Sequence, residues 1–138
     1  MKRLTLALLI IFTAMTACKK DDAERSNERL IGRWTVESMA YVEYVNGQEK
    51  ERDQYSNPGL VWEFRKDGTA VVNTDGEDVD AKWTVTDKNL QLVVPDGTKL
   101  DLNIVSLTNN NLHLSIENDV EIRNGITYTE IVELKLHK

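Results

Sequence analysis

Asparagine–glycine and aspartate–glycine pairs divide this chain into short segments. Five of the seven glycines directly follow Asn or Asp, and a sixth closes Asn57-Pro58-Gly59. Both residues of such a pair tolerate a positive φ angle, so the pair is a strong signal for a tight β-hairpin turn. The spacing therefore predicts short strands joined by hairpins at Asn46-Gly47, Asp67-Gly68, Asp75-Gly76, Asp96-Gly97 and Asn124-Gly125.

Apolar and polar residues alternate between these turns. A period of two is typical of strands that bury one face and expose the other, as in an antiparallel sheet. We expect the following residues to face the core: Leu60, Trp62 and Phe64; Val79, Ala81, Trp83 and Val85; Leu90, Leu92 and Val94; Leu100, Leu102 and Ile104; Leu112, Leu114, Ile116, Val120 and Ile122; Ile126, Tyr128, Val132, Leu134 and Leu136.

These patterns predict eight strands and an all-β fold. The strands are expected near residues 32–45, 60–66, 69–74, 79–86, 89–94, 98–107, 111–122 and 126–137. A meander of this kind favours a small antiparallel up-and-down eight-stranded barrel, because closure removes the exposed edges of a sheet. A two-sheet β-sandwich is the alternative.

Three segments differ from the regular short strands. The strand at 32–45 is too long to stay straight at ~3.3 Å per residue, so we expect a bend at the small residues Ser38 and Ala40. Segment Gln48–Gln54 has no apolar residue and is either a loop or a solvent-exposed edge. The one helical candidate is a single turn over Ser26–Ile31, with Ser26 or Asn27 as its cap.

Residues 1–17 have the composition of a secretory signal peptide and are excluded from the fold. Lys2 and Arg3 precede an apolar run from Leu4 to Met15, and Ala17 supplies a small residue at the cleavage point. The run is shorter than the ~20 residues that a membrane-spanning helix needs.

Cys18, the single cysteine of the chain, follows this segment directly. The sequence Met15-Thr16-Ala17-Cys18 resembles the bacterial lipobox, although Met15 stands where Leu is usual. The resemblance implies acylation of Cys18, and two or three acyl chains anchor a protein stably. The alternative is an ordinary signal peptide followed by a free thiol. A single cysteine also excludes a disulfide framework and a cysteine-based zinc site.

The residues after Cys18 are charged, and we expect residues 18–28 to form a flexible tether to a domain at 29–138. The run from Lys19 to Glu24 resembles the short signal that sends lipoproteins of Bacteroidota to the cell surface, while a solvated tether is the alternative reading. The predicted location is the outer membrane, with the cell surface and the periplasmic face as the two alternatives.

Composition limits the classes of partner. The chain of 138 residues is of one-domain length, and 17 basic against 23 acidic residues give a net charge of −6. Without Lys2 and Arg3 the net charge becomes −8. Nucleic-acid binding needs a basic face, so it is not expected. An acidic body is repelled by anionic lipid and is expected to stand off the membrane.

Three motifs follow one another along the chain: Leu30-Ile31-Gly32-Arg33-Trp34, Trp62-Glu63-Phe64-Arg65-Lys66-Asp67-Gly68-Thr69, and Lys82-Trp83-Thr84-Val85 before Leu90-Gln91-Leu92. Their order resembles the lipocalin-like domains of small Bacteroidota lipoproteins, over about residues 29–137. The chain is shorter than full-size lipocalins and lacks their helix after the barrel. The resemblance implies that Gly32 and Trp34 form the barrel floor, with a basic residue of the last strand over Trp34. Lys135 is the nearest candidate for that residue.

The inward aromatic residues are the candidate ligand-binding residues. Trp62, Phe64 and Trp83 share the inward phase of their strands with Trp34. Eight-stranded barrels hold one small ligand or are packed solid by side chains. These three residues therefore either line a cup for an apolar ligand or fill the barrel, whereas Trp34 is expected in the floor.

Signals for metal binding and catalysis are weak. The acidic run Asp75–Asp80 lacks the ligand spacing of a calcium loop, so a solvated hairpin tip is expected. His113 and His137, the two histidines, have no paired spacing and are expected on the surface. No motif of nucleophilic, metal-dependent or nucleotide-dependent catalysis occurs, so we expect no enzyme, catalytic residue, metal or cofactor.

The sequence thus predicts a lipid-anchored barrel that binds a small apolar or amphipathic ligand. The alternative is a non-enzymatic module that binds or inhibits a protein or glycan, with the polar segment Gly47–Pro58 as a large loop near one mouth. Membership of a larger outer-membrane complex is a third possibility that the sequence does not separate from the second.

Overall fold

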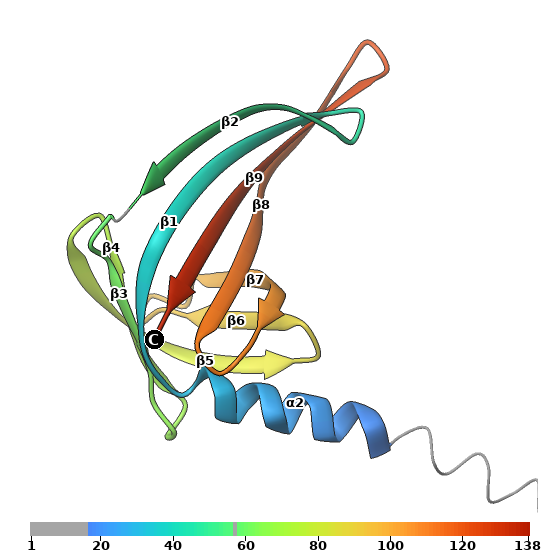
Figure 1. The fold of residues 1–138 in the computed structure, drawn as a ribbon. Helices are drawn as coiled ribbons and strands as arrows, with labels where there is room; N and C mark the ends of the chain where they lie inside the picture. Colours follow the sequence, from blue (N-terminus) through green and yellow to red (C-terminus); the bar gives the residue numbers. More distant parts are fainter. Residues whose placement is uncertain (1–16, 57) are drawn as a thin grey trace, which may run out of the picture.

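The structure is a computed structural model that describes residues 17–56 and 58–138, with side chains from Glu24 onwards. The predicted signal peptide lies outside the described residues except for Ala17. Within the described part, one helix precedes nine strands (Figure 1). They are α2 (Ala17–Leu30), β1 (Gly32–Val45), β2 (Gln48–Ser56), β3 (Val61–Phe64), β4 (Thr69–Thr74), β5 (Glu77–Thr86), β6 (Asn89–Val93), β7 (Lys99–Leu107), β8 (Asn111–Arg123) and β9 (Ile126–His137).

Eight of the strands close into an antiparallel barrel. Strands β3 to β9 pair in sequence order, and β1 pairs with β3 on one side and with β9 on the other. The pairing of Thr35 with His137 and of Val45 with Tyr128 marks the two ends of the β1–β9 seam. The predicted all-β eight-stranded barrel is therefore confirmed, and the predicted strands match the observed ones to within two residues.

Strand β2 is an addition to the barrel. It pairs with residues Ser38–Val45 of β1. Strand β3 pairs with the same edge of β1 closer to its start, over Gly32–Thr35. All nine residues of β2 are exposed. Of the two readings of Gln48–Gln54, the exposed edge is correct, and the expectation of a large loop over Gly47–Pro58 is wrong.

The Asx–Gly pairs form hairpin turns as predicted. In three hairpins both turn residues have positive φ, for example 49° at Asn46 and 77° at Gly47. The turns at Asp75-Gly76 and Asn124-Gly125 share this conformation. Turns with two positive φ angles match the right-handed twist of the strands they join, so they fix the pairing of β1 with β2, β4 with β5, and β8 with β9.

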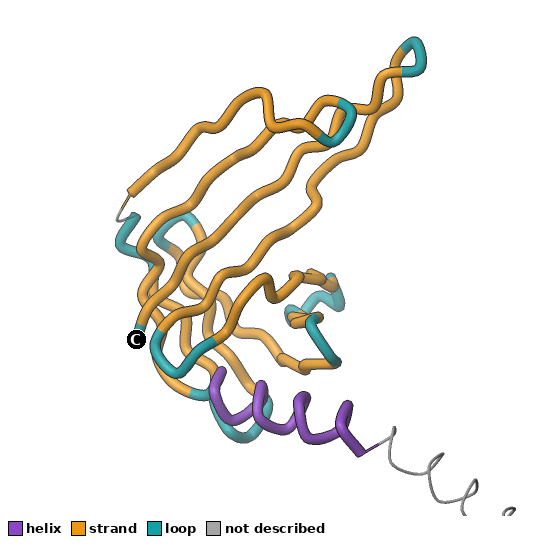
Figure 2. The backbone as a smooth tube through the Cα atoms, turned by 45° about the vertical axis from the view of Figure 1, so that its right-hand side comes forward, coloured by secondary structure: helices purple, strands orange, loops and turns teal. Residues whose placement is uncertain are grey.

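Four strand segments extend beyond the short strands of the barrel (Figures 1 and 2). We call them the extension; they are β2, residues 38–45 of β1, residues 116–123 of β8 and residues 126–133 of β9. Figure 1 shows β1 curving along its length, and the β1–β9 register shifts between Val36 and Ser38. The predicted bend at Ser38 and Ala40 is thus accompanied by a β-bulge at Glu37.

Bulges at Glu37 and Asn118 change which residues of β1 and β8 face the barrel interior. Residues paired directly across antiparallel strands point to the same side, so Met39, opposite buried Leu134, lies on the face that continues the barrel interior. We call this the inner face and its opposite the outer face. A second bulge, at Asn118, moves Val120 and Ile122 to the outer face, where they are 48% and 71% exposed. The prediction that these two residues face the core is wrong, because one extra residue reverses the alternation.

An ion pair covers the outer face of β1 in the extension. Arg52 on β2 donates to the Glu133 carboxylate on β9 at 2.8 Å, reaching across β1. Val42 lies directly between Arg52 and Ile131, and Ala40 directly between Gln54 and Glu133. These two side chains are therefore buried, Val42 completely, although they lie on the outside of the sheet.

Helix α2 precedes the barrel and is longer than the single turn predicted at Ser26–Ile31. Its last residue, Leu30, is fully buried and belongs to the barrel core. The other core residues are Trp34, Val36, Trp62, Phe64, Ala70, Val72, Ala81, Trp83, Leu90, Leu92, Leu102, Ile104, Leu112, Leu114, Leu134 and Leu136. The helix thus lies at one end of the barrel, where its C-terminal residue contributes to the core (Figure 1).

Candidate functional site

The closed end of the barrel is built around Trp34. Its indole Nε1 donates to the carbonyl oxygen of Leu30 at 2.7 Å, which ties the end of α2 to β1. The Lys138 ammonium lies 4.7 Å from the Trp34 ring centroid and donates to the carbonyl oxygens of Arg29 and Ile31. The basic residue over Trp34 is therefore Lys138, and the candidate Lys135 is wrong: Lys135 is exposed, opposite Ser38 on the outer face.

Gly32 is required at this floor. Its φ is 129°, which side-chain-bearing residues rarely adopt, and a Cβ there would lie 3.3 Å from Cε of Lys138. The absence of a side chain thus lets β1 leave α2 and leaves room for Lys138. Gly32 and Trp34 thus lie together at the end of the barrel beside α2, and the floor role that the resemblance implies for them stays a prediction.

The three candidate ligand-lining aromatics pack against one another inside the barrel. Phe64 lies edge-on to Trp62 and to Trp83, with ring centroids 6.3 Å and 5.6 Å apart. All three side chains are buried in the core. The indole N–H groups of Trp62 and Trp83 donate to the carbonyl oxygens of Asn73 and Arg65, both at 3.0 Å. This arrangement satisfies both polar atoms and fills the space around Phe64; a ligand-lining role for these residues stays a prediction.

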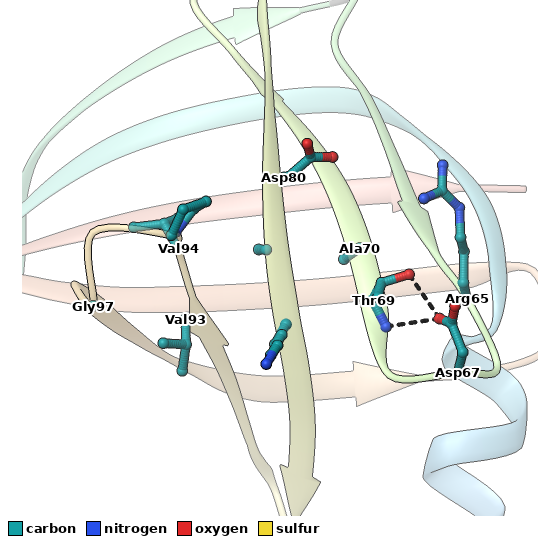
Figure 3. A pocket seen from close by; sticks show the side chains of 11 residues that line it. Arg65, Asp67, Thr69, Ala70, Asp80, Val93, Val94 and Gly97 are labelled. Carbon is teal, nitrogen blue, oxygen red and sulfur yellow. Dashed lines mark hydrogen bonds between the residues drawn. The ribbon is translucent and has the colours of Figure 1, made fainter.

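A cavity of about 630 Å³ lies on the barrel wall (Figure 3). We call it the wall cavity. It is formed by the β3–β4 turn, the adjacent parts of β4 and β5, and the turn that follows β6. Its lining residues are Arg65, Asp67, Thr69, Ala70, Asp80, Ala81, Lys82, Val93, Val94, Pro95 and Gly97.

The wall cavity combines an apolar surface with charges of both signs. The apolar part comes from two alanines, two valines and Pro95, and the charged part from two bases and two acids. Asp67 accepts hydrogen bonds from the Thr69 hydroxyl and amide, at 2.6 and 2.9 Å, and these lower the pKa of its carboxyl (Figure 3).

The two bases of the wall cavity differ in their partners. Arg65 pairs with Glu63 at 2.9 Å, and this contact raises the pKa of its guanidinium. Among the described residues, no hydrogen bond or salt bridge engages the Lys82 side chain. An ammonium beside apolar side chains suits an anionic or amphipathic molecule. Sequence reasoning missed this site because its residues read as turn positions and as ordinary inward- or outward-facing strand positions.

A family model described as a lipocalin-like domain matches residues 30–114, more than half of the chain. The protein belongs to the lipocalin-like domain family. The match begins at Leu30, beside the floor, and ends in β8, so it covers most of the barrel. No curated protein and no solved structure matches the chain.

The acidic run of this lipocalin-like protein lies at the tip of the β4–β5 hairpin. Asn73 organises the tip: its amide donates to the Asp78 carboxylate at 2.7 Å and its carbonyl accepts from the Gly76 amide at 3.2 Å. Over residues 24–56 and 58–138, no three His, Cys, Asp or Glu side chains gather in a way that would hold a metal ion.

The two histidines differ in their surroundings. His113 is half-buried on the outer face of β8, with Nε2 3.8 Å from Glu133 Oε2, whereas His137 is exposed at the end of β9. Burial lowers the pKa of the His113 imidazole, although the neighbouring Glu133 opposes that shift. The prediction that His113 points away from the core is confirmed.

Cys18 lies at the start of α2, and its side chain is outside the described part. In the segments that the structure describes, no helix combines the length and apolar character needed to cross a membrane.

Proposed function

We propose that this lipocalin-like protein is an outer-membrane lipoprotein of Bacteroidota type, anchored through acyl chains on Cys18, that binds a small amphipathic molecule. The lipocalin-like barrel fits a ligand-binding role in general. No residue arrangement described above suggests chemistry on the ligand, so the proposed role is binding without catalysis.

The wall cavity supports this proposal most directly. Its volume of about 630 Å³ falls in the range of ~300–1,000 Å³ that small-molecule sites occupy. The barrel interior, in contrast, is occupied around Phe64 by Trp62 and Trp83. We therefore propose that the apolar part of the ligand contacts Val93 and Val94, and that an anionic group of the ligand faces Lys82.

Native mass spectrometry of the protein purified from its own host tests ligand binding. We expect a retained small molecule that Val93→Trp and Lys82→Glu each remove, because the first fills the cavity and the second reverses its charge. Val105→Trp is the matched control, since Val105 is half-exposed on β7. Repeated absence of a bound molecule, together with no change of tryptophan fluorescence on titration with fatty acids, sterols or haem, would contradict the proposal.

The anchor is tested separately. Cys18→Ala should release the protein from membranes or leave its precursor uncleaved, because the acylated thiol is replaced. A fully processed Cys18→Ala protein that stays in the membrane fraction would remove the anchor from the proposal and leave the ligand site unaffected.

A second candidate function is binding of a protein or glycan by a solid barrel. The packed aromatic interior and the exposed strand β2 favour it. Crosslinking on intact cells should then recover one recurring partner protein.

A further inference from the structure

Strand β2 presents an unpaired edge. In the described part of the chain, β2 forms ladder pairs with β1 only, so its other edge leaves backbone N–H and C=O groups without strand partners. The β1–β2 register shifts at Lys50, which leaves a regular run from Glu51 to Ser56. Such an edge is a template for the addition of another strand.

This edge is fixed in position before any partner arrives. Arg52 ties β2 to Glu133 on β9 and to Glu49, with contacts of 2.8 Å each. On the inner face, the Tyr55 ring stacks edge-on against Tyr41 at 6.2 Å. A preorganised edge loses little conformational entropy on binding, which favours association.

The inner face beside this edge carries a row of like charges. The strand registers place Glu51 opposite Glu43, Glu43 opposite Glu130, and Glu130 opposite Asp119, so four carboxylates cross the four strands of the extension in one line. Like charges directly opposite one another destabilise a sheet. The hydrogen bond that Asn118 donates to Glu130 at 2.8 Å supports one member of the row.

The row ends at the unpaired edge. Glu51 is its last member, and Asp53 lies two residues further along β2 on the same face. A residue added opposite Glu51 would continue the row, and a residue added opposite Asp53 would lie beside it. Basic side chains at these two positions would offset the repulsion, because each would have a carboxylate directly across the strand.

We propose that the edge of β2 binds an extended basic segment of a partner protein as a tenth strand. The backbone of that segment pairs with Glu51–Ser56, and its Lys or Arg side chains, two residues apart, lie opposite Glu51 and Asp53. The residue between them lies on the outer face opposite Arg52 and is therefore acidic or uncharged. This surface is independent of Cys18 and of the wall cavity.

Synthetic peptides test the proposal on the full chain in nonionic detergent micelles. The probes are fluorescein-labelled Thr-Lys-Thr-Lys-Thr-Lys-Thr, its Thr-Glu counterpart, and the lysine peptide with alternate backbone nitrogens methylated. We expect the lysine peptide alone to bind, measured by fluorescence anisotropy, and to slow amide hydrogen exchange in β2. Methylation should weaken binding by about tenfold or more, because it removes two or three backbone hydrogen bonds.

Charge-reversed variants distinguish strand addition at β2 from nonspecific electrostatic attraction between a basic peptide and an acidic protein. Glu51→Lys/Asp53→Lys should lose the lysine peptide and bind the glutamate peptide, whereas Glu28→Lys/Glu77→Lys, with the same change of net charge elsewhere, should behave as the parent. Equal binding of the methylated peptide, equal losses in the two double variants, or protection of β2 by self-association without peptide would each overturn the proposal.

Discussion

The ammonium of Lys138 lies 4.7 Å from the ring centroid of Trp34 and donates to the carbonyl oxygens of Arg29 and Ile31, at 2.7 and 2.9 Å. One side chain thus connects the end of the chain, the last turn of α2 and the barrel floor. The cation also lies where the C-terminal end of a helix favours positive charge.

Replacement of Lys138 should destabilise the barrel. We expect Lys138→Met to lower the free energy of unfolding by about 1–3 kcal/mol, because a cation–π contact and two charge-assisted hydrogen bonds are lost. Lys135→Met is the matched control and should change stability by less than about 0.5 kcal/mol. Urea unfolding measures both, and equal effects of the two substitutions would contradict the role assigned to Lys138.

Arg52 should control the local stability of β2. Arg52→Met keeps much of the apolar stem over Val42 but removes the contacts with Glu133 and Glu49. Because both ends of the ion pair are partly exposed, we expect a global loss of only about 0.5–1 kcal/mol. Hydrogen exchange should nevertheless become faster throughout β2, and a double-mutant cycle with Glu133→Gln isolates the pair. Arg65→Met, whose partner Glu63 lies two residues before it in β3, should leave β2 exchange unchanged.

His113 should make stability depend on pH. Burial is the largest influence and lowers the pKa of His113 from 6.5; Glu133 opposes it, and Lys135 and Arg52 reinforce it. Its Nε2 has no hydrogen-bond partner among the described residues. The unfolded chain therefore binds the proton more tightly, so this contribution to stability is complete above pH 6.5 and is lost as the pH falls toward the folded-state value.

Urea midpoints between about pH 7.5 and 5.5 measure this effect. His113→Gln should flatten the profile, while His137→Gln, which alters an exposed histidine, should retain the slope of the parent. A parent profile that is flat over this range, or one that rises as the pH falls, would contradict the assignment.

Phe64 should dominate the packing of the barrel interior. It is almost fully buried and contacts both Trp62 and Trp83. We expect Phe64→Ala to cost about 3–5 kcal/mol, because it removes apolar contacts and leaves a cavity between the two indoles. Tyr55→Ala, at a residue that is 54% exposed, should cost no more than about 1 kcal/mol. Similar unfolding midpoints for the two variants would show that the interior is not packed around Phe64.

The strands of the barrel were predictable because their signals are local. The Asx–Gly turns and the period-two alternation mark each strand within a few neighbouring residues, and they locate all eight. The bulges at Glu37 and Asn118 were not predicted: Asn118 lies between Glu117 and Asp119, and Glu37 lies where the expected bend at Ser38 and Ala40 did not specify an extra residue. The faces of Val120 and Ile122 were therefore assigned wrongly, although the strand that contains them was found.

In the candidate sites, too, features set by local sequence were predictable and features set by distant parts of the chain were not. The inward phase of Trp62, Phe64 and Trp83 follows from alternation and is confirmed by their burial. The wall cavity combines residues of the β3–β4 turn, β4, β5 and the turn after β6, which no local sequence pattern brings together. The role of Lys138 was not predicted, because this residue follows the last predicted strand. Its position over Trp34 is set by the pairing of β9 with β1.

The pairing of β1 with β9 determines when the barrel can close during folding. Thr35 finds its partner in His137, close to the opposite terminus, so the twelve residues of β9 must be available before the hydrophobic interior is sealed from solvent. Contacts between residues so far apart in the sequence lower the rate of folding. A nascent or truncated chain without β9 would therefore keep two unpaired strand edges, one on β1 and one on β8. Closure of the barrel depends on β9.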